Sequence, residues 1–272
     1  MILDSEKFRT FERAGWESIP SAYDDAFGQL TSQAIDPLLD AVKLRKGGNF
    51  LDIACGPGYV AAAAAKRGAT VLGVDFSAAM IAHARERWPG IDFREGDAEE
   101  LQVGNALFDA AAMSFGILHL GRPEKALLEA CRVLRRGGRF AFSVWSKPEE
   151  TIGFGIVLRA VEQYGEPRVE LPEGPPFFRY SDPEECIRGL LVAGFASPAV
   201  TKVSQLWRLP AGDGLFNAMK DSTVRTAGLL RAQKPTVLNK IRQAMRAELE
   251  PYTKGDVVEL PMPALIASGV KP

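Results

Sequence analysis

The chain has 272 residues, of which 46% are hydrophobic and 25% charged, and its formal net charge is −1 at pH 7. This composition is typical of a globular protein that buries a full hydrophobic core, and it argues against a disordered chain. The near-neutral charge removes the electrostatic attraction on which nucleic-acid binding normally depends, so we expect no nucleic-acid partner.

The sequence carries no signal for export, membrane insertion or metal binding. The N-terminus has no basic region followed by an apolar run, and no later stretch of about 18 residues is apolar enough to span a membrane. The three cysteines, Cys55, Cys131 and Cys186, are odd in number and widely spaced, which favours neither a disulfide framework nor a metal site. We therefore expect a cytoplasmic protein with no metal site and no membrane partner.

Apolar strand-like runs alternate with helical segments from residue 49 to about residue 146. The expected strands cover residues 50–54, 70–75, 91–94, 108–114 and 139–145. Apolar residues at helical spacing predict a helix before the first strand, over residues 35–42. Ser77 is expected to begin the helix after the second strand and Pro89 to end it. The alternation predicts a parallel sheet wrapped by helices.

The second half of the chain is less regular. Prolines and aromatic residues crowd residues 147–180, which we interpret as an insertion. Strand-like runs at residues 199–207 and 257–260 flank a helical stretch, 214–249, which belongs to a second insertion at about residues 210–252. These two runs bring the expected total to seven strands.

A turn that contains glycine follows the first expected strand. Residues 51–58 leave a buried-type strand and enter a helix, where the small Gly56 and Gly58 let the backbone approach a ligand. A plain strand-to-helix turn that needs positive φ is the alternative. The next strand ends in Asp75, 19 residues after Gly56, where a carboxylate can accept both hydroxyl hydrogens of a ribose. A helix-capping aspartate is the alternative there.

Residues after the second and third strands suit an adenine ring. The Asp97 side chain can take an adenine amino hydrogen, and the amide of Ala98 can bond a ring nitrogen. Phe76 can stack on one face of the ring, and Met80 can cover its edge. A simple turn and a buried helix start are the alternative interpretations.

Together these residues resemble class I S-adenosylmethionine-dependent methyltransferases, most closely the small-molecule group that includes ubiquinone and menaquinone biosynthesis methyltransferases. The resemblance covers residues 49–145, and residues 52–58 are similar to the family's first motif, with Ala54 in place of its usual first glycine. It implies an α/β fold with a seven-stranded, doubly wound Rossmann-like sheet and helical insertions after strands five and six. The implied cofactor is S-adenosylmethionine, and the implied partner is a small-molecule acceptor.

Roles for individual residues follow from the motifs and from the resemblance. The candidate cofactor-binding residues are Asp52, Ala54, Gly56, Gly58, Asp75, Phe76, Met80, Asp97, Ala98 and Ser114. The resemblance further implies an N-terminal helical lid, residues 1–45, ahead of a methyltransferase domain, residues 46–272. Tyr23 in this lid is a candidate cofactor contact, with ordinary packing as the alternative.

The family's mechanism needs little side-chain chemistry, because in-line positioning of the reacting atoms can supply about 7–11 kcal/mol. His119 is the candidate general base for an acceptor that must lose a proton, and a packing histidine is the alternative. His83 is expected to be a half-exposed helix residue. Phe177, Phe178 and Tyr180 are expected to form a wall of the acceptor pocket, with packing of the lid as the alternative.

Two other functions share part of this pattern. An NAD(P)-dependent oxidoreductase also places glycines after strand one and an acid after strand two, but Ala61 stands where its third glycine belongs. A non-catalytic S-adenosylmethionine-binding regulatory protein would keep the cofactor site and block the acceptor pocket. The acceptor, its reacting atom and the oligomeric state carry no motif in this sequence.

Overall fold

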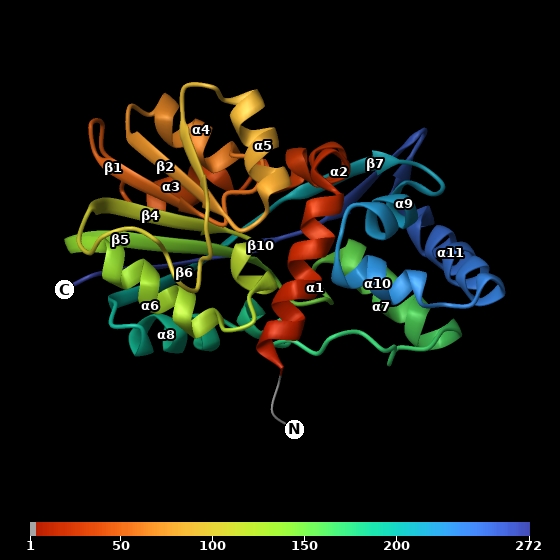
Figure 1. The fold of residues 1–272 in the computed structure, drawn as a ribbon. Helices are drawn as coiled ribbons and strands as arrows, with labels where there is room; N and C mark the ends of the chain where they lie inside the picture. The colour runs from red at the N-terminus through yellow and green to blue at the C-terminus, as the bar shows by residue number, and fades with distance from the viewer. Residues whose placement is uncertain (1–3) are drawn as a thin grey trace.

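The computed structural model describes residues 4–272 and shows an α/β molecule made of two parts (Figure 1). One part is a mixed seven-stranded sheet with helices on both faces, and the other is a group of helices with a three-stranded sheet. The seven-stranded α/β sheet confirms the predicted fold class. Residues 1–3, which begin the predicted lid, lie outside the described residues.

The main sheet has the strand order β3-β2-β1-β4-β5-β10-β6. Its strands are β1 (Asn49–Ile53), β2 (Thr70–Asp75), β3 (Asp92–Glu95), β4 (Phe108–Ser114), β5 (Leu134–Trp145), β6 (Ala196–Val203) and β10 (Ala264–Val270). The first five are parallel, and β10 runs antiparallel between β5 and β6. The connections reverse direction between β1 and β4, and sheets of this kind bind ligands at the carboxyl ends of the strands beside such a reversal.

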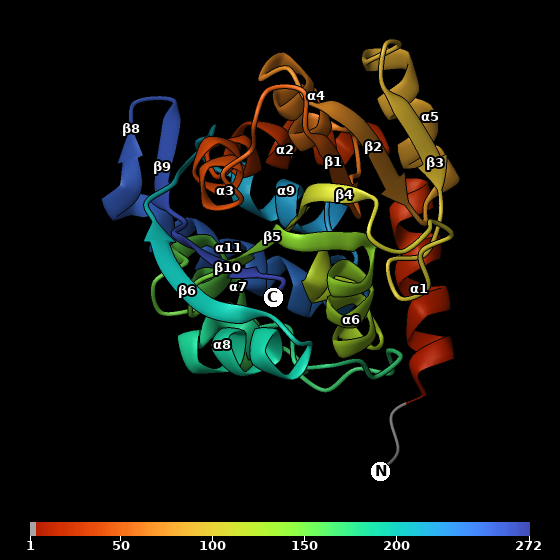
Figure 2. The same cartoon turned by 90° about the vertical axis from the view of Figure 1, so that its left-hand side faces the viewer.

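Helices cover both faces of this sheet (Figure 2). One face carries α3 (Ile35–Ala41), α4 (Tyr59–Lys66) and α5 (Ala78–Arg87), and the other carries α6 (Pro123–Val133) and α8 (Pro183–Val192). The Ser77 hydroxyl accepts a hydrogen bond from the Met80 N–H, so the predicted start of α5 is confirmed. The helix ends two residues before Pro89, as expected for a residue that cannot continue a helix.

In the second half of the chain, one predicted strand has the wrong bounds and another lies in a different sheet from the one expected. Residues 199–207 are not one strand, because β6 ends at Val203 and β7 (Leu206–Pro210) joins a separate sheet. Between them, the buried Gln205 side chain donates to the Leu30 carbonyl at 2.8 Å, which draws the chain out of the main sheet. The predicted last strand belongs to the same small sheet, ordered β7-β9-β8, as β9 (Val257–Pro261) beside β8 (Thr253–Lys254). The seventh strand of the main sheet is instead β10.

A helical cap built from distant parts of the chain lies beside the sheet. Its helices are α1 (Ser5–Ser18), α2 (Pro20–Ser32), α7 (Ile152–Tyr164), α9 (Gly214–Asp221), α10 (Arg225–Arg231) and α11 (Pro235–Leu249). The short turns are η1 (Gly116–His119), η2 (Arg179–Ser181) and η3 (Glu250–Tyr252). Trp207 of β7 is buried against α2, where its indole N–H donates to the Ala26 carbonyl at 2.8 Å and its ring lies 4.6 Å from that of Phe27.

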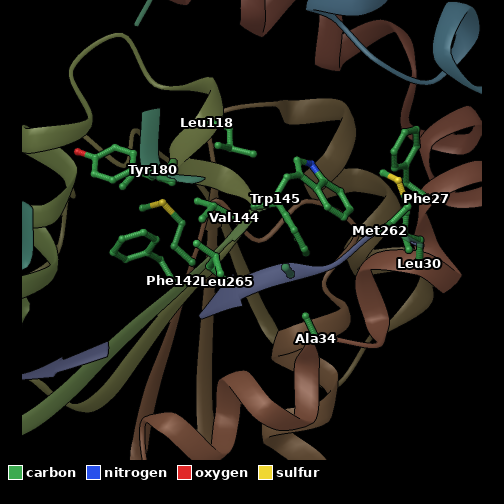
Figure 3. Packing of buried hydrophobic residues seen from close by; sticks show 14 of the residues in the cluster. Phe27, Leu30, Ala34, Leu118, Phe142, Val144, Trp145, Tyr180, Met262 and Leu265 are labelled. Atoms are coloured by element: carbon green, nitrogen blue, oxygen red, sulfur yellow. The ribbon is translucent and has the colours of Figure 1, made fainter. Parts of the chain in front are cut away.

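The cap and the sheet share one hydrophobic core. Figure 3 shows Val144 of β5 beside Leu265 of β10, with Trp145 between this part of the sheet and Phe27 of α2. The Trp145 ring is 4% exposed and stacks 4.1 Å from Phe115. Burial on this scale fixes the cap on the sheet, because apolar area removed from water contributes about 25 cal/mol per Å². No helix within residues 4–272 is both long and apolar enough to cross a membrane.

Candidate functional site

A cavity opens where the carboxyl ends of β1, β2 and β4 meet the helical cap. Its lining includes Tyr23, Ala54, Gly56, Asp75, Phe76, Met80, Asp97, Ala98, Ser114 and His119. The sheet edge thus brings together most of the residues that the sequence selects. Asp52 and Gly58 do not line the cavity. Asp52 lies beneath the glycine turn, and Gly58 forms the end of that turn.

Asp52 is a buried carboxyl group under the turn. Its Oδ2 accepts a hydrogen bond from the Ala61 N–H at 2.8 Å, which ties the first turn of α4 to β1. Its Oδ1 is buried and has no hydrogen-bond partner in the described part of the chain. Burial raises the pKa of Asp52 to about 8, so the group is largely protonated at neutral pH.

The two glycine positions of the turn differ in why they require glycine. Gly58 precedes α4 with φ +82°, and a Cβ there would lie 2.6 Å from Cζ of Phe93, so both conformation and packing demand glycine. Gly56 has φ +50°, but a Cβ there would meet no atom within 4 Å. The backbone at Gly56 therefore faces open space, as a ligand-contacting turn requires.

Asp75 lies at the end of β2 and is only 6% exposed. Its Oδ2 accepts from the Gly56 N–H at 2.8 Å, and its Oδ1 accepts from the Ser77 N–H at 2.9 Å. Burial raises the pKa of Asp75 to about 6, and the two N–H groups oppose that shift. Each carboxylate oxygen keeps a further acceptor position for a ligand hydroxyl.

Asp97 already has partners in this structure. Its Oδ1 accepts from the Glu99 N–H at 2.8 Å, while its Oδ2 forms an ion pair with Arg9 of α1. Arg13, one turn further along α1, forms an ion pair with Glu95 at the end of β3. Helix α1 therefore crosses the predicted adenine end of the cavity and is held there by charge.

His119 is paired with Glu12, a residue that the sequence reasoning missed. Its Nδ1 lies 3.0 Å from Oε2 of Glu12, and the same oxygen accepts from the Trp16 indole N–H at 3.1 Å. Glu12 is fully buried. The partners are 107 residues apart in the chain, so only the four-residue spacing of Glu12 and Trp16 on α1 could have suggested the arrangement.

Aromatic rings form much of the cavity wall around His119. Trp16 lies 4.8 Å from His119 on one side, and Phe177 lies 6.0 Å from it on another. The prediction that Phe178 and Tyr180 share this wall was wrong. Phe178 packs at 5.8 Å on Phe154, and Tyr180 packs at 5.7 Å on Phe142 in the core.

Two further residues singled out by the sequence lie on helices: Tyr23 on α2, which lines the cavity, and His83 on α5, which does not. Tyr23 stacks 5.8 Å from Phe27 in α2, and burial raises the pKa of its phenol. His83 is a partly exposed residue of α5, as expected, with its Nε2 3.5 Å from Oδ2 of Asp24. Within residues 4–272, no three His, Cys, Asp or Glu side chains gather in a way that could hold a metal ion.

The family comparison agrees with this arrangement. Residues 51–142 match the family model of the methyltransferase domain. This segment is a methyltransferase domain. The match begins in β1 and ends in β5, so it contains the glycine turn, Asp75, Asp97 and His119. The predicted resemblance to class I S-adenosylmethionine-dependent methyltransferases is confirmed.

Curated relatives point to the same family. The chain is 38% identical over 111 residues to demethylmenaquinone methyltransferase of Paenarthrobacter aurescens, covering 41% of this chain and 44% of that protein. It is 34% identical over 159 residues to the enzyme of the same name from Clavibacter sepedonicus, covering 54% of this chain and 64% of that protein. The chain spans about half the length of the curated relatives it matches.

Solved structures share the fold over nearly the whole chain. A phosphoethanolamine N-methyltransferase of Haemonchus contortus superposes with a TM-score of 0.61 at 20% identity, covering 97% of this chain and 60% of that one. An S-adenosylmethionine-dependent methyltransferase of Thermotoga maritima superposes with a TM-score of 0.57 at 20% identity, covering 96% and 100%. The methyltransferase domain thus has the Rossmann-like methyltransferase fold.

Proposed function

We propose that this protein is an S-adenosylmethionine-dependent methyltransferase that acts on a small-molecule acceptor. The observation that carries the proposal is the arrangement of the Gly56 turn, Asp75 and Asp97, in that order, along one sheet edge around one cavity. The methyltransferase domain and the demethylmenaquinone methyltransferases among the relatives support it.

The residues at this edge fit S-adenosylmethionine. Asp75 offers buried acceptor positions for ribose hydroxyls, and the open space at Gly56 admits the rest of the nucleoside. Phe76 and Met80 line the same cavity and would flank the adenine, with Asp97 at its edge. When bound, the cofactor supplies a methyl group on a positively charged sulfur that leaves readily, so the protein's main task is to hold the acceptor in line.

We further propose that His119 takes the proton that an oxygen or nitrogen acceptor loses. Donation from Nδ1 to Glu12 leaves Nε2 as the proton-accepting nitrogen, and the Glu12 carboxylate stabilises the imidazolium that forms. Trp16 donates to the same carboxylate and closes it off from water. A carbon acceptor that is already a strong nucleophile would make less use of this pair.

The cap is the part of the molecule that we propose to close over the ligands. In this proposal residues 4–45 act as the lid, Tyr23 contacts the cofactor, and the segments near 147–180 and 210–252 enclose the acceptor. The three cysteines are all free, which supports a location in the reducing cytoplasm. The near-neutral net charge supports a small molecule rather than a nucleic acid as the acceptor.

Calorimetric titration with S-adenosylhomocysteine and, separately, with NADH tests the cofactor assignment. We expect S-adenosylhomocysteine to bind and NADH to fail, because the third glycine of a dinucleotide turn is Ala61 here. The reverse result would establish the oxidoreductase alternative. Binding without methyl transfer to any phenol, quinone, amine or small acid would favour the non-catalytic alternative.

The role of His119 is tested with whichever of these acceptors turns over. His119→Gln is expected to lower kcat by about 10²–10⁴-fold for an oxygen acceptor, while leaving the affinity for S-adenosylhomocysteine nearly unchanged. His83→Gln, a partly exposed residue of α5 that does not line the cavity, is the matched control. An equal effect of both substitutions, or no effect of either, would remove His119 from the reaction.

A further inference from the structure

Arg225 is a cation on the cavity wall that forms no ion pair within residues 4–272. It is the first residue of α10 and lines the cavity together with its neighbours Val224 and Thr226. In the part of the chain that the structure describes, its one side-chain hydrogen bond runs from Nη1 to the Pro175 carbonyl at 3.0 Å. A guanidinium has five N–H donors in a planar fork, so most of its hydrogen-bonding capacity is unused.

Two aromatic rings lie next to the guanidinium of Arg225. Its guanidinium carbon lies 5.1 Å from the ring centre of Phe8 and 5.6 Å from that of Phe177. Burial lowers the pKa of Arg225, and the negative charge of Glu12 opposes that shift without coming within 4.0 Å. Glu12 directs its hydrogen-bonding oxygen to His119 and Trp16 instead. A cation in such a place is costly unless an anion joins it.

Arg225 stands on the acceptor side of His119. Phe177 connects the two, because its ring lies 6.0 Å from the His119 ring and 5.6 Å from the guanidinium. The residues proposed for the ribose and adenine, Asp75 and Asp97, are on the sheet edge, whereas Arg225 belongs to the cap. It also lies outside residues 51–142, the segment that matches the methyltransferase domain.

We propose that Arg225 binds a carboxylate carried by an aromatic acceptor, whose hydroxyl group then faces His119. The proposal rests on the function proposed above and narrows its acceptor class. A carboxylate matches the guanidinium fork with two parallel hydrogen bonds, and the rings of Trp16, Phe154 and Phe177 on the cavity wall suit a flat apolar body. The acceptor class is therefore a hydroxylated aromatic acid, which differs from the quinone-type acceptor in the relatives' names.

Paired probes test this assignment. The protein is saturated with S-adenosylhomocysteine and titrated calorimetrically with 4-hydroxybenzoate and with 4-hydroxybenzamide, which differ in charge and little in shape. We expect the acid to bind at least about tenfold more tightly than the amide, as for a charge-assisted hydrogen bond in an apolar site. Equal affinities, a preference for the amide, or no binding of the acid would overturn the proposal.

Variants identify the residue responsible. Arg225→Gln should bring the acid-to-amide ratio to about one, and Arg225→Lys should retain part of it, because a lysine keeps the charge without the fork. Arg231→Gln, an exposed arginine on the same helix, is the control and should leave the ratio unchanged. If Arg225→Gln does not fold, the ratio of the wild-type affinities for the acid and the amide still tests the proposal.

The titration of S-adenosylhomocysteine alone separates failure of this proposal from failure of the proposed function. If the wild-type protein does not bind it, the methyltransferase proposal fails first. If the wild type binds it but shows no preference for the acid, only the Arg225 assignment fails. If Arg225→Gln weakens S-adenosylhomocysteine binding as much as acid binding, Arg225 serves the cofactor carboxylate and the assignment is wrong.

Discussion

At the scale of a single residue, Asp75 is expected to make the proposed cofactor binding depend on pH. Its pKa of about 6 lies above the usual range because the side chain is buried, and the ionised form is the better acceptor for ribose hydroxyls. We therefore expect the dissociation constant of S-adenosylhomocysteine to be roughly tenfold larger at pH 5 than at pH 7 and above. Calorimetric titrations between pH 5 and pH 8 measure this profile.

Variants of Asp75 separate the effect of its charge on binding from an effect on folding. Asp75→Ala is expected to weaken binding by about 1–3 kcal/mol at pH 7, and Asp75→Asn to remove the pH dependence between pH 5 and pH 7. Asp92→Asn, an exposed aspartate at the start of the neighbouring strand β3, should behave as wild type. Unchanged affinity of Asp75→Ala would contradict the alignment of the motifs with this sheet edge.

Asp52 couples the stability of the fold to pH. Its pKa of about 8 in the folded protein is raised above the unfolded value of about 3.9, so the folded state binds the proton more tightly. The stabilisation is complete below about pH 4 and is lost as the pH rises to about 8, by at most about 1.4 kcal/mol per pH unit. Asp75, whose folded pKa is about 6, adds a contribution of the same sign between pH 6 and pH 7, so the difference between the wild type and Asp52→Asn gives the part that belongs to Asp52.

Urea unfolding at pH 6 and pH 8 measures the effect of Asp52. The free energy of unfolding of the wild type should fall between these values, and Asp52→Asn should flatten the dependence because the amide carries no proton to lose. Asp92→Asn serves again as the exposed control. A wild type whose stability rises from pH 6 to pH 8 would show that Asp52 is ionised when folded.

At the scale of a secondary-structure element, helix α1 is held on the sheet half of the molecule by a few charged contacts. The Glu17 carboxylate accepts from the Ala78 N–H at 2.7 Å and from the Ala79 N–H at 2.9 Å, at the start of α5. Carboxylates are stabilised at helix N-termini, where unpaired N–H groups and the helix dipole meet. Glu17 is therefore an anchor of α1 on α5.

Glu17→Gln should loosen α1 without unfolding the sheet. We expect faster hydrogen exchange over residues 5–18, by an opening that is about 1 kcal/mol easier, while exchange in β1 to β5 stays unchanged. Lys7→Gln, an exposed residue near the start of α1, is the control. Equal exchange rates in Glu17→Gln and the wild type would mean that apolar packing alone holds the helix.

The elements that the sequence predicts well are those whose partners are close in the chain. Strands β1 to β5 and the capped helix α5 follow from local patterns, because each parallel strand pairs with one reached by a single crossover. Strand β10 lies between β5 and β6, more than a hundred residues after β5. The apolar runs of β9 and β10 look alike locally, so no local pattern could show which one enters the main sheet.

The candidate site, too, could be predicted from the sequence only in part. The cofactor residues follow strand ends, and strand ends meet at one edge in a parallel sheet, so their spacing in the sequence carries the information. Glu12 and Arg225 belong to the cap, and their importance appears only when α1, α10 and the loop before Pro175 are packed together. Sequence reasoning missed both because neither belongs to a motif.

At the scale of the whole molecule, the two ends of the chain build the cap jointly. Gln33 of the N-terminal segment exchanges two hydrogen bonds with the backbone of Leu206, and the Leu30 and Ala26 carbonyls accept from Gln205 and Trp207. Helix α2 also packs on α9 and β7. The N-terminal helices and residues 205–262 therefore pack as one unit beside the main sheet, to which the C-terminal strand β10 itself belongs.

This joint construction bears on how the acceptor preference of such a protein can change. A graft of residues 205–262 alone would bring in a foreign surface beneath α2 and leave carbonyl groups of Ala26 and Leu30 without their present donors. Successful exchange of specificity requires both terminal portions to be replaced together, while the donor-binding middle can be retained. New acceptors would then be gained by paired replacement of segments far apart in the gene.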